Sequence, residues 1–302
     1  MSRHWLQLPE RGTAFTLRLI SWIGLHLDPW GPWAARLLLY PITAYYVVTI
    51  TPSVRQASQN YLRRVLARRV YWWHTARHFH CYASMILDRV FLLANRFRHF
   101  KLNIHNGEVV LDRVAAKQGC ILLGAHLGSF EALRAIGATH KLGVKVLMNI
   151  DHNEKMTQLM GALNPAIARD IIPLGHPDAL LKAKESLEQG YLIGLLGDRV
   201  FNQDNTVNCQ FLGATAKFPA GPIRLAAALR CPVILAFGIV RKSGHYDIYF
   251  EPFAERIECQ RQQRQLDLQI WTQRYAERLE HYTRSAPYNW FNFYDYWDNN
   301  AA

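Results

Sequence analysis

The sequence predicts an α/β fold in which helices flank a largely parallel central sheet, with a helical segment in front of it. Three observations carry this prediction. The chain has 302 residues, half of them apolar, which is enough to bury a full core. From residue 101 onward, short apolar runs alternate with helical stretches, as in strands joined by crossover helices. Before residue 101 the apolar blocks are longer and are interleaved with arginines. We therefore divide the chain into residues 1–100 and an α/β domain, residues 101–302.

The amino-terminal segment is basic and aromatic. Residues 1–101 hold 14 Lys and Arg against 3 Asp and Glu, so they carry +11 of the formal charge of +12. The apolar run 15–27 is followed by the run 37–54, whose 18 uncharged residues are interrupted by two prolines and fall short of the about 20 that a membrane span needs. We expect helices that lie in the interface of an anionic membrane, with ordinary core helices as the alternative. Aromatic side chains suited to headgroup depth are Trp5, Trp22, Trp30, Trp33, Tyr40, Tyr45 and Tyr46.

The second part of the chain alternates between strand and helix patterns. Apolar runs predict strands at residues 120–124, 144–149, 170–173, 192–196, 233–239 and 246–250. Periodic stretches predict helices at residues 130–140, 154–163, 177–189, 219–229 and about 262–282. In a largely parallel sheet the carboxyl ends of the strands form the edge where ligands bind.

One predicted strand end carries a histidine followed by an acid. His126 comes two residues after the first strand, and Glu131 lies in the first turn of the next helix. A carboxylate in that turn could reach back, fix the tautomer of the imidazole and stabilise the imidazolium. Gly128 lets the backbone turn tightly and leaves room for a ligand. Asp198, which follows the strand at residues 192–196, should arrive at the same edge. The alternative is a glutamate that only balances the helix dipole, beside a loop histidine.

Cysteine spacing and charge pattern limit the other classes. The five cysteines are widely separated and include no CxxC pair, which is typical of a reducing compartment. We expect neither a metal site nor a bound cofactor. The basic charge alone would also suit nucleic acid, but the sequence contains no recognisable nucleic-acid-binding motif. Because the arginines alternate with apolar blocks rather than small polar ones, anionic lipid is the favoured partner.

The block around His126 resembles a known motif. Gly-Ala-His-Leu-Gly-Ser-Phe-Glu, residues 124–131, is similar to the HxxxxD/E block of the lysophospholipid and glycerolipid acyltransferase superfamily. It resembles more closely the late acyltransferases of lipid A biosynthesis, the lauroyl and myristoyl transferases. The similarity extends in order from about residue 101 to 295. Supporting stretches are Gly197-Asp198-Arg199, Phe211-Leu212-Gly213-Ala214 and Ala286-Pro287-Tyr288-Asn289-Trp290-Phe291.

The resemblance implies a membrane acyltransferase. Such an enzyme moves a fatty acyl chain from an acyl carrier protein or coenzyme A thioester to a hydroxyl of a lipid acceptor. His126 would take the hydroxyl proton, Glu131 would orient the imidazole, and no acyl-enzyme would form. The thioester would be a co-substrate, so no cofactor is implied. The expected location is the cytoplasmic face of a bacterial inner membrane. Candidate substrate-binding residues are Arg169, Asp198, Arg199 and Gly128.

Two stretches depart from the family pattern. Residues 147–160 lack the usual tyrosine-arginine or arginine before asparagine-proline, and residues 291–297 lack the usual histidine and double arginine. Since those cations suit a highly phosphorylated acceptor, the acceptor is either lipid A-like or another membrane lipid, including an aryl-polyene-type conjugate. A thioesterase or esterase using the same pair of residues, and a non-catalytic protein that binds anionic lipid, are the alternative functions.

Overall fold

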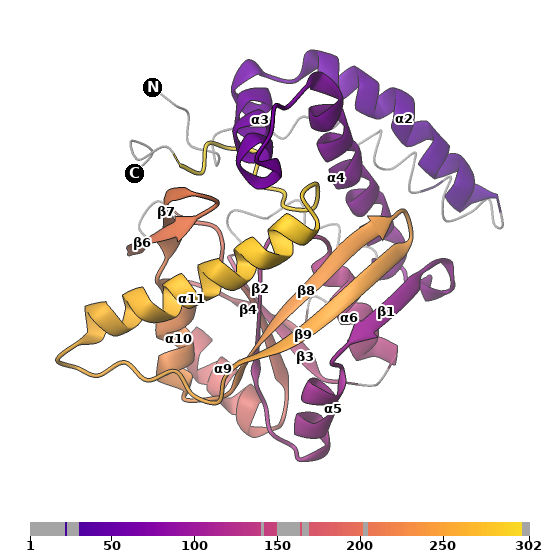
Figure 1. Cartoon of the computed structure of the whole chain (residues 1–302). Helices are drawn as coiled ribbons and strands as arrows, with labels where there is room; N and C mark the ends of the chain where they lie inside the picture. Colours follow the sequence, from indigo (N-terminus) through magenta and orange to yellow (C-terminus); the bar gives the residue numbers. More distant parts are fainter. Residues whose placement is uncertain are drawn as a thin grey trace.

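The structure, a computed structural model, describes residues 22, 30–139, 142–149, 164, 169–201 and 205–297. It confirms the α/β class with a mostly parallel sheet (Figure 1). Seven strands form the central sheet in the order β1-β9-β8-β2-β5-β3-β4, and a separate hairpin consists of β6 and β7. The bounds are β1 Lys101–His105, β2 Ile121–Gly124, β3 Val144–Met148, β4 Ile171–Pro173, β5 Leu192–Leu196, β6 Thr206–Phe211, β7 Ala214–Pro219, β8 Val233–Lys242 and β9 His245–Ala254.

Strand direction places the loop containing His126 at one edge of the sheet. Strand β2 lies between β5 and β8 and runs parallel to both. Strands β3 and β4 continue in the same direction, whereas β9 returns antiparallel to β8 and pairs in parallel with β1. All six strands predicted from apolar runs are present. The prediction missed β1 and the β6–β7 hairpin, because most residues of β1 are exposed and β6 buries only alternate residues.

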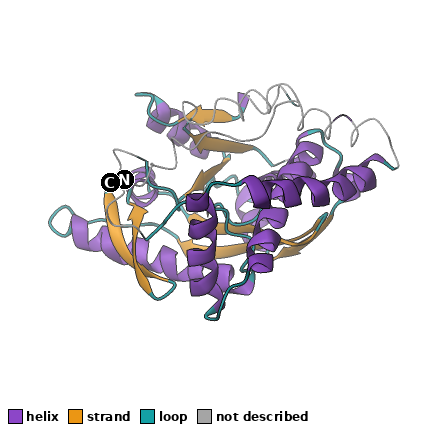
Figure 2. Cartoon of the chain, turned by 90° about the horizontal axis from the view of Figure 1, so that it is seen from above, coloured by secondary structure: helices purple, strands orange, loops and turns teal. Residues whose placement is uncertain are grey.

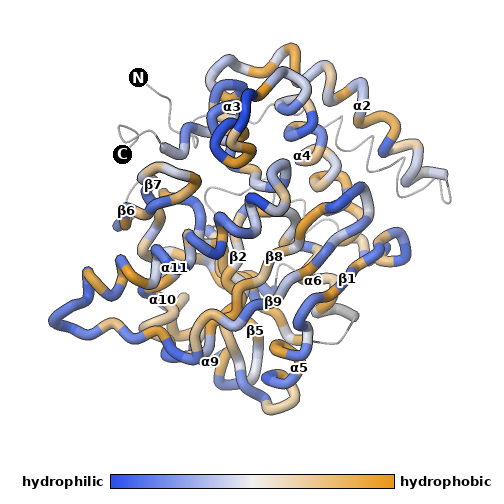
Figure 3. Tube along the Cα trace, viewed as in Figure 1, coloured by the Kyte–Doolittle hydropathy of each residue, from blue (hydrophilic) through white to orange (hydrophobic). Residues whose placement is uncertain are grey.

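Helices cover both faces of the sheet. Helices α5 (Glu108–Ala115) and α6 (Phe130–Thr139) pack on one face, where apolar residues of β2, β8 and β9 form a core. On the other face lie α9 (Ala179–Glu188), α10 (Gly221–Leu229) and α11 (Arg264–Ser285), which share a second core with the same strands. Figure 3 shows the apolar residues concentrated along these central strands. Four of the five helices predicted for this part are observed, and the fifth, at residues 154–163, lies outside the described residues.

The amino-terminal segment forms a layer of helices beside the carboxyl ends of the parallel strands (Figures 1 and 2). Within residues 30–100, its helices are α2 (Gly31–Thr49), α3 (Pro52–Leu66) and α4 (Trp72–Leu93), followed by a short 3-10 turn, Phe97–His99. Met85 and Leu92 of α4 belong to the core under α6, so this layer is packed into the α/β domain. The division into two domains stays a prediction. The apolar run 15–27 lies outside the described residues, apart from Trp22.

A buried carboxylate connects α2 and α4 to the β8–β9 hairpin. Asp88 of α4 is fully buried and accepts hydrogen bonds from Arg36 of α2 at 3.2 Å, the hydroxyl of Tyr246 at 2.9 Å and the backbone N–H of Gly244 at 3.1 Å. Burial raises the pKa of Asp88, although the arginine and these donors oppose the rise.

Among the described helices, none alone has the length and apolar character of a membrane span; α2 and α3 reach that threshold only as a pair, bent by 106°.

Candidate active site

Strand register brings His126 and Asp198 together. Gly124 at the end of β2 is paired with Leu196 at the end of β5, and each of the two side chains follows its strand end by two residues. Nδ1 of His126 lies 2.7 Å from Oδ1 of Asp198. The backbone N–H of His126 points at the same carboxylate, 3.0 Å from each oxygen. The expectation that Asp198 arrives at the same edge as His126 is thus confirmed, and their direct contact was not predicted.

The carboxylate of Asp198 is held by further donors from the carboxy-terminal segment. The indole Nε1 of Trp290 donates to Oδ2 at 2.9 Å, and the amide Nδ2 of Asn292 donates to the same oxygen at 3.0 Å. The hydroxyl of Tyr296 donates to the backbone carbonyl of Asp198 at 2.8 Å. Sequence reasoning missed all three partners. The available signal was a conspicuous mixture of aromatic and amide side chains in residues 288–297.

Residues 289–291 run beside the loop that carries His126. Gly128 donates its N–H to the carbonyl of Asn289 at 2.8 Å, and Phe291 donates to the carbonyl of His126 at 2.8 Å. Gly128 has a φ of +70°, and a Cβ on it would lie 1.9 Å from the carbonyl oxygen of Gly238. The N–H of Gly128 is therefore bonded within the protein, and the position requires glycine for close packing. Its contact with a substrate stays a prediction.

The prediction that Glu131 contacts His126 is wrong. Its carboxylate lies 2.8 Å from Nε of Arg89 on α4, and the hydroxyl of Ser129 donates to it at 3.3 Å. The Glu131 side chain is only 6% exposed, so its charge needs a buried cation. Because α6 packs against α4, Arg89 provides that cation, while Asp198 takes the place beside the imidazole. Arg89 could have been suspected from the sequence, because charge is rare in the apolar stretch 81–95.

The two candidate arginines lie at different edges of the sheet. Arg199 is beside the site: Nε donates to Oδ1 of Asn292 at 2.8 Å and a terminal nitrogen donates to the carbonyl of Phe291 at 2.9 Å. Arg169 precedes β4, and β4 runs parallel to β2 through β3 and β5. It therefore lies at the amino end of its strand, away from His126, and the structure does not bring it to the site.

The charges define the protonation state of the pair. Burial alone would raise the pKa of Asp198, but the adjacent His126, its hydrogen bonds and Arg199 together lower it to about 2. Burial lowers the pKa of His126, Arg199 lowers it further, and Asp198 opposes both. At neutral pH a neutral imidazole then donates Nδ1–H to an ionised carboxylate. Nε2 has no hydrogen-bond partner among the described residues, and the side chain is 26% exposed. That nitrogen can act as a general base.

The lowered pKa of His126 predicts the pH dependence of any reaction that uses it as a base. The active form is the neutral imidazole, which is lost as pH falls through the pKa of the group. We expect the kcat/KM to rise with pH through a midpoint below 6.5, the ordinary value, and to be level from there to neutral pH. A rate profile between pH 4.5 and 8 measures this. A midpoint above 6.5 would contradict the described electrostatics.

Comparison with known proteins identifies the family. The family model of bacterial lipid A biosynthesis acyltransferases matches residues 82–299. The chain belongs to this family. A search of curated proteins found no matching sequence. The match to the lipid A acyltransferase family covers β1–β9 and includes His126, Asp198, Arg89 and Trp290. The recognised relationship to the lipid A late acyltransferases is thereby confirmed.

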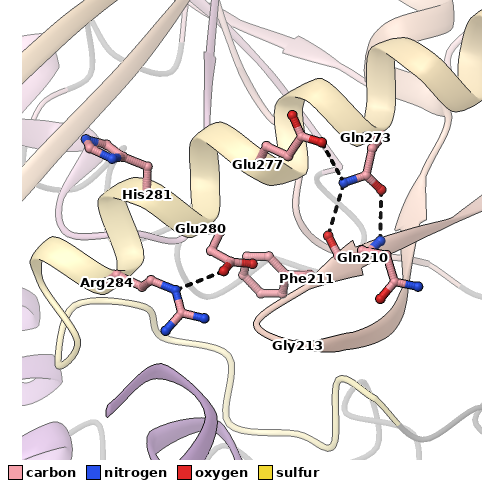
Figure 4. Close-up of a pocket in the computed structure, with 8 residues that line it drawn as sticks. All are labelled: Gln210, Phe211, Gly213, Gln273, Glu277, Glu280, His281 and Arg284. Carbon is pink, nitrogen blue, oxygen red and sulfur yellow. Dashed lines mark hydrogen bonds and ion pairs between the residues drawn. The ribbon is translucent and has the colours of Figure 1, made fainter. Parts of the chain in front are cut away.

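In this lipid A-type acyltransferase, a cleft of about 490 Å³ lies away from the histidine, between the β6–β7 hairpin and α11 (Figure 4). Its polar lining is largely bonded internally: Gln273 pairs with Gln210 and Glu277, while Glu280 accepts from the N–H of Leu212 and from Arg284. Its link with the site is Phe211, whose ring lies 5.2 Å from that of Trp290. The cleft adds no group to the His126 site.

Proposed function

We propose that the protein transfers a fatty acyl chain from an acyl thioester to a hydroxyl of a membrane lipid, with His126 as the general base. The observation that carries this proposal is the contact between His126 and a fully buried Asp198 at the carboxyl edge of the sheet, within the region that matches the acyltransferase family. The donor is an acyl carrier protein or coenzyme A thioester. The acceptor is lipid A-like or another membrane lipid, including an aryl-polyene-type conjugate.

The reaction needs one proton acceptor and one site for developing charge. Nε2 of His126 takes the proton of the lipid hydroxyl as its oxygen attacks the thioester carbonyl carbon. The C–S bond then breaks, and the leaving thiolate takes the proton from the imidazolium to form a thiol. Asp198 stabilises the imidazolium and holds Nδ1 in the protonated tautomer. Arg199 supplies a neighbouring positive charge. Glu131 acts by holding Arg89, as a positioning residue.

The amino-terminal segment, residues 1–100, would place this site on an anionic membrane at the cytoplasmic face of a bacterial inner membrane. Residues 29–87 contain seven arginines and neither Asp nor Glu. Helix α2 buries one apolar stripe and exposes another on its outer side, including Trp33 at 64%, Tyr45 at 65% and Val48 at 77% exposure. A helix that is apolar on its solvent side is suited to a lipid interface.

An aromatic turn between α3 and α4 adds to this surface. Tyr71 stacks on Trp73 at 4.5 Å and lies under the guanidinium of Arg69 at 5.4 Å, while Trp72 is 70% exposed. Arg68 lies in the same turn. Indole rings and arginines together suit the headgroup region of an anionic bilayer.

The double variant Trp72→Ala/Trp73→Ala is expected to weaken vesicle binding. Burying one large apolar side chain is worth about 1.5–3 kcal/mol, so we expect affinity for vesicles of anionic lipid to fall by at least about 10-fold. Co-sedimentation with phosphatidylglycerol-containing vesicles measures the change. The matched control is Leu266→Ala/Ile270→Ala, which removes two exposed apolar side chains from α11. Equal binding by wild type and the tryptophan variant would exclude this turn from the membrane contact.

Product analysis tests the proposed reaction. The purified protein is incubated with labelled acyl carrier protein or coenzyme A thioester, with and without vesicles containing a lipid A precursor or a phospholipid. Mass spectrometry of the lipids should detect one added acyl chain in wild type, formed at least about 100-fold more slowly in His126→Asn. Release of free fatty acid at the same rate without any acceptor would instead favour a thioesterase. Binding to the vesicles without either product would favour the non-catalytic alternative.

A further inference from the structure

Two buried polar side chains outside the site connect the amino-terminal helices to Asp198. Ser58 of α3 and His78 of α4 are both fully buried, and the Ser58 hydroxyl lies 2.9 Å from Nδ1 of His78. Nε2 of the same ring lies 2.9 Å from the backbone carbonyl of Trp290. The mechanism described above uses neither residue. Yet Trp290 is the residue whose indole donates to Asp198.

The chemistry of these contacts defines the tautomer of His78. A carbonyl oxygen only accepts hydrogen bonds, so Nε2 must carry the proton. Nδ1 is then the acceptor, and the hydroxyl of Ser58 donates to it. Burial lowers the pKa of His78 to about 4, which keeps the ring neutral at physiological pH. The hydrogen bonds therefore run in one direction, from the hydroxyl of Ser58 to His78 and from His78 to the carbonyl of Trp290. Because the ring stays neutral, this direction is stable over the working pH range.

This chain of hydrogen bonds ends on the backbone of residues 289–291, which runs beside the His126 loop. Besides its indole contact, Trp290 is bracketed by two backbone contacts to the His126 loop, from Gly128 to Asn289 and from Phe291 to His126. Tyr61 of α3 adds a second anchor, donating to the carbonyl of Pro287 at 2.8 Å while its ring lies 5.1 Å from that of Trp290. A displacement of this peptide would move a donor away from Asp198 and shift the backbone of His126.

We infer that Ser58 and His78 are positioning residues for the His126–Asp198 pair, so that the amino-terminal helices complete the acid–base site as well as carrying the membrane contact. This inference rests on the proposed function for its effect on rate. Groups that orient a catalytic side chain through a second hydrogen bond act in this way in many sites. His78 lies before residue 82, outside the part of the chain that the family model matches.

Loss of this positioning should change the pKa of His126 in one direction. The indole donor on Oδ2 withdraws negative charge from the Asp198 carboxylate. When that donor moves away, the carboxylate stabilises the imidazolium of His126 more strongly. The pKa of His126 should then rise, although the site is less well ordered. A merely structural loss at His78 would lower the folded fraction and leave that pKa unchanged.

The experiment compares His78→Leu, His78→Gln and Ser58→Ala with Thr75→Val in the full chain. The glutamine amide nitrogen can keep the bond to the Trp290 carbonyl, whereas leucine removes it. Thr75 is buried one turn earlier on α4, and its hydroxyl has no hydrogen-bond partner among the described residues, so Thr75→Val is a control on the same helix. We expect His78→Leu to lower kcat about 10- to 100-fold, with the KM for the thioester little changed, and His78→Gln to recover most of the loss.

The pKa of His126 provides a readout that does not depend on acyl transfer. It is measured by NMR titration of histidine-labelled protein, with the His126 signal assigned by its absence in His126→Asn. We expect a higher pKa in His78→Leu, a smaller rise in Ser58→Ala, and no change in Thr75→Val. If His78→Leu does not fold, Ser58→Ala decides the question. The inference is overturned if folded His78→Leu or Ser58→Ala titrates as wild type does, or if glutamine and leucine impair kcat equally. If wild type transfers no acyl chain, the titration still tests the positioning while the proposed function fails.

Discussion

Replacing His126 with asparagine is expected to lower kcat for acyl transfer by about 10²–10⁴-fold, the usual contribution of a general base. The asparagine amide can still donate to Asp198 in place of Nδ1, so the loss is that of the basic Nε2 atom rather than of the local structure. The melting temperature should change little. The measurement is initial-rate kinetics with a labelled thioester and the lipid acceptor, together with a thermal unfolding curve.

The control for this prediction is His105→Asn on the edge strand β1. His105 is 44% exposed and lies on the far side of β9 and β8 from β2, so its loss should leave the rate unchanged. A His126→Asn protein that is folded and transfers acyl chains at a rate close to wild type would rule out a general-base role for this histidine.

Replacing Asp198 with asparagine is expected to cost on the order of 10⁴-fold in kcat, as is typical when the orienting carboxylate of a catalytic histidine becomes an amide. The carboxylate accepts from the N–H and Nδ1 of His126 and from the side chains of Trp290 and Asn292. An amide has only one oxygen and would present its NH₂ group to some of these donors. The imidazole would then turn or change tautomer, which removes the base from Nε2. Since Asp198 raises the pKa of His126, the acid limb of the residual rate profile should also move to lower pH.

A comparison with Glu131→Gln tests which carboxylate supports His126: that of Asp198, which contacts it in the structure, or that of Glu131, which the sequence indicated. Glu131 balances Arg89 in a mostly buried ion pair, so its neutral variant should lose stability by about 3 kcal/mol and lose less kcat than Asp198→Asn. Adding Arg89→Gln should restore part of the stability, because the unpaired cation is then removed. Rates measured below the melting temperature of each variant, with unfolding curves, decide the point. Full activity in Asp198→Asn with none in folded Glu131→Gln would instead assign the imidazole to Glu131.

Local patterns were sufficient for most elements of the α/β fold. Buried strands such as β2 and β5 read as continuous apolar runs because both of their faces are covered. The edge strand β1 and the β6–β7 hairpin lacked that signal. Strand β1 exposes four of its five residues, and β6 alternates buried and exposed positions, so neither forms an apolar run. The place of β1 in the sheet depends on pairing with β9, which lies far away in the chain, whereas β6 pairs with β7 across the two-residue turn at Leu212 and Gly213.

The sequence by itself determined the class of fold, the strand end on which His126 sits and, through the motif of residues 124–131, the acyltransferase family that the family match confirms. The partner of His126 was decided only by the tertiary structure. Glu131 is five residues from the histidine and was the natural local choice, whereas Asp198 is 72 residues away. Strand register brings Asp198 beside the imidazole, while a cation from α4 binds Glu131. The physical reason is that a carboxylate can be buried only where cations or hydrogen-bond donors compensate its charge. Here those groups belong to residues far apart in the chain.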